Sequence, residues 1–171
     1  VVDSFDALIT SAFANDCNAL CWKRDLSGNF DEILRGLEPA GGIVPVDEDW
    51  LRDADLSPAG RAAARTILED LRQLREAGHE PEVNVIGAYP TDPDEALPTD
   101  VYSFHVDSAT VPTDTFLCCY AGLPSEGLRR VDALRTVEVP ELRARLLAAF
   151  GGADDGSFAE FLKETHQDLH F

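Results

Sequence analysis

Apolar residues recur at helical spacing in five stretches of the chain, and each stretch predicts an amphipathic helix. The predicted helices cover residues 3–14, 27–37, 58–77, 140–150 and a last stretch that begins at 157. The third is the most strongly marked, because Ser57 is a good N-cap, Pro58 stands at the first helical position and Gly78 suits the C-terminal cap. In the last stretch, Ser157 and Glu160 form a capping box.

Between the helices the apolar pattern changes to the alternation that is typical of strands. Strands are predicted over residues 18–23, 83–89, 101–107 and 115–120. The acidic stretch 47–49 is predicted to be a surface loop. This order of elements indicates an α+β fold in which helices brace a mainly antiparallel sheet. The length fits one domain over residues 1–171, with a mainly helical flank over 1–80 and a β-core with inserted helices over 81–171.

The charge balance excludes several classes of partner. Lys and Arg total 14 against 32 Asp and Glu, which gives a formal net charge of −18. Binding to nucleic acid or to an anionic membrane needs an excess of basic residues, so we expect neither. No apolar run has the length of a membrane span, no signal segment is apparent, and 4 cysteines are too few for a disulfide scaffold. We therefore expect a cytoplasmic protein with reduced thiols.

The segment 101–107 carries the residues that are most suited to chemistry. Alternate side chains of a strand share a face, so Ser103, His105 and Asp107 point to the same side. One imidazole and one carboxylate, joined by a second histidine from elsewhere, form the 2-His-1-carboxylate set that suits non-haem Fe(II). The other interpretation is that His105 is a core histidine that is hydrogen-bonded to Asp107. Both interpretations stay open.

Two later histidines are candidates for the third ligand. His166 and His170 lie four residues apart, so a continuing helix would place both on one face. If the chain instead turns into a strand after Gln167, His170 alone would reach the metal. The sequence leaves both possibilities open.

Three neighbouring segments, 104–107, 115–122 and 123–128, resemble the metal-binding core of the double-stranded β-helix (cupin-like) iron oxygenases. The chain is similar above all to an uncharacterised bacterial group with a His-x-Asp strand and a Tyr-x-Gly-x-Pro turn. The resemblance implies a jelly-roll fold in which His105 and Asp107 bind iron and a distal histidine completes the site. It also implies that 2-oxoglutarate often serves as cosubstrate, held by a later Arg or Lys.

Two features depart from that family. A closed jelly roll needs about eight strands, whereas the pattern gives about five or six. No Arg or Lys follows His170 to hold the cosubstrate. Since residues 168–171 look like the start of a further strand, we expect the natural protein to extend beyond Phe171, with the sandwich incomplete at this end of the chain.

The sequence therefore predicts a mononuclear non-haem Fe(II) dioxygenase-like oxidoreductase that uses 2-oxoglutarate and acts on a small molecule or an amino-acid-derived substrate. The expected metal ligands are His105, Asp107 and His170, with His166 as the alternative to His170. The expected substrate contacts are Ser103, Tyr120 and Arg129. The alternative function is a non-catalytic cupin-like module that holds zinc or another small ligand. A basic protein partner would suit the acidic chain, and a homodimer is also open.

Overall fold

The computed structural model describes residues 1–14, 17, 19–37, 42–89, 91, 97, 99–111 and 113–171. The chain forms two compact units, one made of residues 1–87 with 120–122 and the other of residues 88–119 with 123–171. Each unit has a hydrophobic core of its own. The single domain over residues 1–171 stays a prediction.

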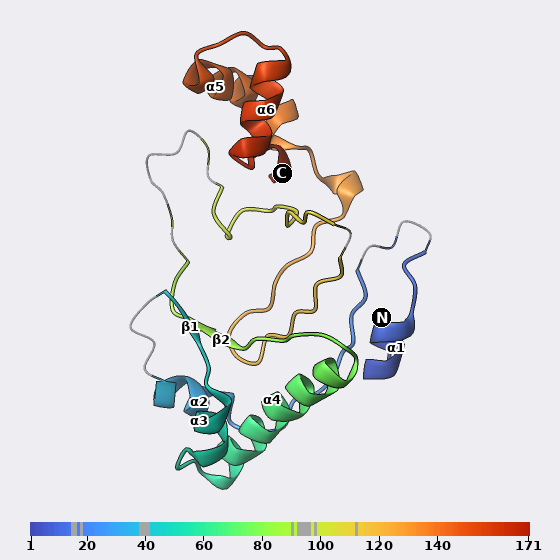
Figure 1. The fold of residues 1–171 in the computed structure, drawn as a ribbon, viewed down its shortest axis with the longest axis vertical. Helices are drawn as coiled ribbons and strands as arrows, with labels where there is room; N and C mark the ends of the chain where they lie inside the picture. Colours follow the sequence, from blue (N-terminus) through green and yellow to red (C-terminus); the bar gives the residue numbers. More distant parts are fainter. Residues whose placement is uncertain are drawn as a thin grey trace. The chain divides into compact units, whose positions relative to one another are not determined.

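The longest helix of the first unit is α4, Pro58–Glu76, and it begins at the predicted residue (Figure 1). The Ser57 hydroxyl accepts a hydrogen bond from the Gly60 N–H (3.1 Å) and so caps the helix. Ser57 also donates from its hydroxyl (2.6 Å) and from its N–H (2.7 Å) to the Glu32 carboxylate, and these bonds lower the pKa of Glu32. One serine therefore joins the start of α4 to the segment that carries Glu32.

Three shorter helices belong to the same unit, namely α1 (Phe5–Thr10), α2 (Phe30–Leu37) and α3 (Glu48–Asp53). The helices predicted over 3–14 and 27–37 are therefore confirmed in shortened form. Helices α2 and α3 both pack against α4, and buried side chains of this region form the first core. Its members are Ile33, Leu51, Leu56, Ala63, Ala64, Ile67 and Leu71.

The prediction of a loop at residues 47–49 is wrong, because α3 begins there. The Asp47 carboxylate accepts a hydrogen bond from the Asp49 N–H (2.8 Å) and caps the helix. Leu51 is buried in the first core, and Trp50 packs against it. The acidic run thus forms a helix N-terminus, where negative charge is favourable.

Within the described residues, the structure contains one sheet, in which β1 (Ile43–Pro45) pairs antiparallel with β2 (Asn84–Ile86). The strand predicted over 83–89 is therefore confirmed in shortened form. The predicted α+β fold with a mainly antiparallel β-sandwich or jelly roll is wrong, since 44% of the structure is helical and only these two short strands form a ladder in the described part of the chain.

The other predicted strands do not form ladders in the part of the chain that the structure describes. In the described residues of 18–23 and 101–107, only single bridges form, one at Trp22 and one at His105, and residues 115–120 form no strand. Asn18 lies outside the described residues. A strand needs a neighbour for its N–H and C=O groups, and an alternating pattern of side chains does not provide one.

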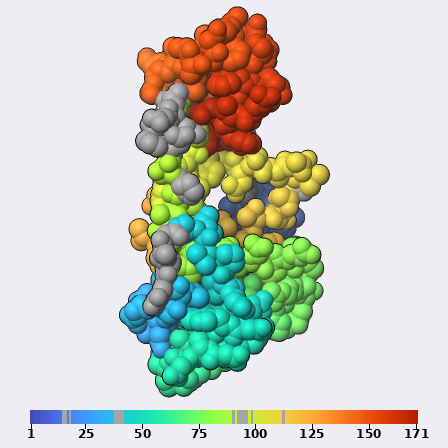
Figure 2. Space-filling model, turned by 60° about the vertical axis from the view of Figure 1, so that its left-hand side comes forward, coloured from blue at the N-terminus to red at the C-terminus, as the bar shows by residue number. Residues whose placement is uncertain are grey.

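The second unit has its core at two helices, α5 (Pro140–Phe150) and α6 (Gly156–Glu164). In the space-filling view of Figure 2, the atoms of these helices pack closely together in the orange-to-red part. Helix α5 ends as predicted at Gly151, which has a φ of 74°. The N-cap of α6 is Asp155 rather than the predicted Ser157, because the Asp155 carboxylate accepts a hydrogen bond from the Ser157 N–H (2.9 Å). The buried core residues are Leu97, Val137, Leu146, Phe158 and Leu162.

Short 3-10 helices connect these elements. They are η1 (Arg130–Asp132), η2 (Thr136–Glu138) and η3 (Gln167–Leu169). Helix η2 packs against α5, and η3 packs against both α6 and η2. Among the helices of the described residues, none has both the length and the apolar character needed to cross a bilayer.

We expect Leu146→Ala to destabilise the second unit by about 2–5 kcal/mol, because this buried side chain would leave a cavity. Leu123→Ala is the matched control, since Leu123 belongs to the same unit and is 95% exposed, and its effect should stay within about 0.5 kcal/mol. Urea denaturation followed by circular dichroism measures both free energies. Equal effects of the two substitutions would contradict the assignment of the core.

Candidate functional site

A short antiparallel contact brings two of the predicted ligands together within the second unit. His105 and His170 form an isolated antiparallel bridge. On either side of it, the Phe171 N–H donates to the Phe104 carbonyl (2.9 Å) and the Val106 N–H donates to the carbonyl of residue 169 (3.0 Å). The end of the described chain therefore lies against the segment that carries the His-x-Asp pair.

The side chains at this bridge form a cluster of two imidazoles and one carboxylate. The rings of His105 and His170 are stacked, with their centroids 5.4 Å apart and an angle of 29° between their planes. His105 Nε2 lies 3.4 Å from Asp107 Oδ1. His170 is buried and the Asp107 side chain is largely exposed, so the cluster reaches from the interior of the unit to solvent.

The hydrogen bonds of His105 determine which of its ring nitrogens carries a proton. Its Nδ1 lies 2.7 Å from the Ser103 carbonyl oxygen, which can only accept, so Nδ1 is the donor. In the neutral imidazole the lone pair is then on Nε2, which lies 3.4 Å from Asp107 Oδ1. A cation close to both acceptors would interact favourably with each of them.

The same argument applies to His170. The Ser103 hydroxyl donates to the Asp100 carbonyl (2.8 Å) and lies 2.8 Å from His170 Nδ1. Because the hydroxyl has only one proton, His170 Nδ1 must be the donor in this pair, and the lone pair of the neutral ring is on Nε2. The arrangement also argues against a Ser103 nucleophile activated by His170, since the hydroxyl proton is directed to Asp100.

The donor atoms of this cluster fit a metal in their chemistry, and partly in their positions. Two ligand atoms at about 2.1 Å from one metal and at right angles to each other lie about 3 Å apart, close to the separation of His105 Nε2 and Asp107 Oδ1. Stacked rings do not direct both lone pairs at one ion, so one ring must turn. Accordingly, no group of three or more His, Cys, Asp or Glu in the described ranges is arranged to hold a metal as it stands.

The two late histidines lie in different surroundings. Helix α6 ends at Glu164, and the chain then continues through η3, so His166 and His170 do not share a helical face. His166 is exposed and has a φ of 58°, whereas His170 is buried at the bridge. Of the two, His170 is the one that lies with His105.

Two of the predicted substrate contacts, Arg129 and Tyr120, are bound to partners of their own. Arg129 is exposed, and its Nε donates to the Asp132 carboxylate (2.6 Å) in a local ion pair. Tyr120 belongs to the first unit, where its hydroxyl donates to Asp70 Oδ2 (2.7 Å) and its ring stacks on Phe30. Ser103 is the one member of this set that contacts the histidine cluster.

Asp70 on α4 is the centre of a second polar cluster, which the sequence analysis missed. Besides the Tyr120 hydroxyl, it accepts two hydrogen bonds from Arg24, of which the bond from Nη1 is 2.7 Å long. The Arg24 guanidinium also lies over the Trp22 ring, 4.6 Å from its centroid. Three segments of the first unit therefore meet at one carboxylate.

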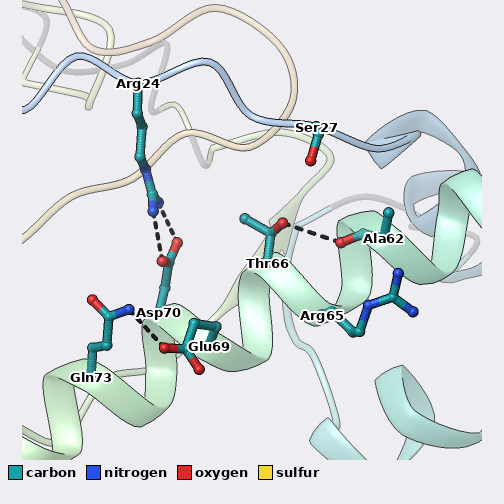
Figure 3. A pocket seen from close by; sticks show the side chains of 8 residues that line it. All are labelled: Arg24, Ser27, Ala62, Arg65, Thr66, Glu69, Asp70 and Gln73. Carbon is teal, nitrogen blue, oxygen red and sulfur yellow. Dashed lines mark hydrogen bonds and ion pairs between the residues drawn. The ribbon is translucent and has the colours of Figure 1, made fainter.

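A pocket of about 310 Å³ lies beside this cluster (Figure 3). Its lining residues are Arg24, Ser27, Ala62, Arg65, Thr66, Glu69, Asp70 and Gln73. Figure 3 shows the Arg24 guanidinium facing the Asp70 carboxylate rather than the open space. Hydrogen bonds from Arg72 and Gln73 lower the pKa of Glu69 to about 2. Arg24, Asp70 and Glu69 thus serve pairs within the protein, which favours a structural role for these three charges.

Comparison with known proteins adds nothing to this geometry. No family model matches the chain, and searches of curated proteins and of solved structures find no significant match. The likeness to cupin-like iron oxygenases therefore stays a prediction from motifs, and function has to be argued from the site itself.

We expect Tyr120→Phe to destabilise the first unit by about 1–2 kcal/mol, because Asp70 would lose a hydrogen bond to a charged acceptor while the ring is kept. Tyr89→Phe is the control, since Tyr89 belongs to the other unit. Thermal unfolding followed by circular dichroism measures both. A Tyr120→Phe variant with wild-type stability would show that this bond contributes nothing.

Proposed function

We propose that His105, Asp107 and His170 bind one Fe(II) and that the protein is a mononuclear non-haem iron dioxygenase acting on a small molecule, with 2-oxoglutarate as cosubstrate. The observation that supports this proposal most directly is the position of His105 Nε2, which lies 3.4 Å from Asp107 Oδ1 while Nδ1 of the same ring is bound to the Ser103 carbonyl. A cation between these two acceptors would stabilise both. The buried imidazole of His170 lies next to them as the third donor.

The donor set argues for this metal and this chemistry. Two imidazoles and one carboxylate leave coordination positions open, and iron bound in this way supplies the activation of O2. The chain itself contributes orientation. The Ser103 carbonyl binds Nδ1 of His105 and the Ser103 hydroxyl contacts Nδ1 of His170, so one residue orients both rings through their Nδ1 atoms.

The alternative function is a non-catalytic module that holds zinc. Imidazole and carboxylate ligands suit Zn²⁺ as well as Fe(II). The cluster's donor chemistry does not separate the two metals, so the distinction depends on whether the bound metal turns over oxygen.

We expect His105→Ala to lower the affinity for Fe(II) by more than about 100-fold. The loss should exceed the range that is typical for an outer-shell partner, because His105 is proposed to bind the metal directly. The measurement is iron content after anaerobic reconstitution and desalting. His79→Ala is the control, because His79 is an exposed histidine of the other unit. His166→Ala decides between the two late histidines and should retain iron, whereas His170→Ala should not. Unchanged iron content in His105→Ala would contradict the site.

We expect the reconstituted protein to consume O2 in the presence of 2-oxoglutarate, and His105→Ala to abolish this consumption. An oxygen electrode measures the rate, and succinate release measures the turnover of the cosubstrate. Tight zinc binding that depends on His105, without oxygen consumption in the iron form, would instead support the non-catalytic module.

A further inference from the structure

We propose that Arg135 is the positioning residue for His170, because its guanidinium holds the backbone turn that carries this histidine and so fixes the imidazole beside His105. The part of the inference that concerns metal affinity rests on the proposed function. The part that concerns the place of the His170 ring does not.

Arg135 and its neighbour bind two carbonyls of the same short segment. Arg135 Nε donates to the Asp168 carbonyl oxygen (2.9 Å), and Nη2 donates to the same oxygen. Nη2 also lies 3.8 Å from the Asp168 carboxylate. The next residue, Thr136, donates its N–H to the His170 carbonyl (2.9 Å). Consecutive residues therefore hold the backbone at His170 and just before it.

The turn needs such support, because η3 is weak on its own. A 3-10 helix has poorer hydrogen-bond geometry than an α-helix, and the last carbonyls of a helix have no partner within it. His166 precedes η3 with a φ of 58°, which is unfavourable for a residue with a side chain. Hydrogen bonds from a charged guanidinium are stronger than those between neutral groups, so Arg135 suits this position.

The imidazole is held separately from the backbone that carries it. Ser103 contacts Nδ1 of His170, and the Phe171 N–H bonds to the Phe104 carbonyl on the same side. If the guanidinium is removed, the turn can shift while Ser103 stays in place. The hydrogen bond that selects the Nδ1–H form of His170 would then lengthen, and the stacking on His105 would change.

Lysine is not an equivalent replacement for Arg135. The guanidinium presents two N–H groups to one carbonyl oxygen, whereas the ammonium of lysine is a compact point charge with different geometry. Arg135→Lys therefore keeps the charge and removes the paired donation. It should give an intermediate effect if the paired bonds position the turn.

The test compares Arg135→Ala and Arg135→Lys with Arg130→Ala, which removes an exposed arginine of the same unit. Nitrogen-15 NMR of the metal-free protein reports which ring nitrogen of His170 carries the proton. Titration with Co(II), followed by visible absorption, reports metal affinity. In Arg135→Ala we expect a mixture of the two His170 tautomers and Co(II) binding that is about 10–100-fold weaker, the range for loss of an outer-shell partner. Arg130→Ala should match the wild type in both.

The outcomes separate this inference from the proposed function. An Arg135→Ala variant that keeps the Nδ1–H tautomer and binds Co(II) within about twofold of the wild type overturns the positioning role. If that variant does not fold, Arg135→Lys decides by the same readouts: a shifted tautomer population supports the role and a wild-type population overturns it. A wild-type protein that binds no Co(II) overturns the proposed function, and the His170 tautomer in the metal-free variants still decides the role of Arg135.

Discussion

Two main-chain hydrogen bonds between residues 104–106 and 169–171 determine what the candidate site can be. At a net contribution of about 1 kcal/mol for each bond, they would not keep two isolated segments together. The contact exists because its second segment is already fixed, by the packing of η3 against α6 and η2 and by the Thr136 N–H. The helical part of the second unit thus supports a pairing that the two segments alone would not form.

The α-helices other than α3 could be predicted because their signals are local. Ser57 and Pro58 act within the first turn of α4, and the apolar stripe of a helix is visible without knowledge of its partner. Whether residues 101–107 form a ladder depends instead on a neighbour that is distant in the chain. Alternation marks a segment that can be a strand, but the described backbone pairs there only at His105. The predicted β-sandwich failed at this non-local step.

The candidate site also has one part that follows from local spacing and another that depends on distant parts of the chain. The spacing of His105 and Asp107 is a local property, and their side chains do lie close together. Which later histidine lies beside them depends on where α6 ends and on the contacts that hold the following turn. The spacing of residues in the sequence predicts neither. The sequence does not mark Asp70, because nothing local distinguishes the carboxylate of this helix face that distant segments reach.

The first unit takes residues 120–122 from the later half of the sequence, so the polypeptide passes from one unit to the other after residues 87, 119 and 122. A fragment that stops at Gly87 would contain every helix of the first unit but leave Asp70 without its phenol donor. The complementary fragment would carry that tyrosine without its acceptor. Each piece would therefore lack one partner of this hydrogen bond, and combining two separately expressed pieces would restore it only if the aromatic side chain returned to Asp70.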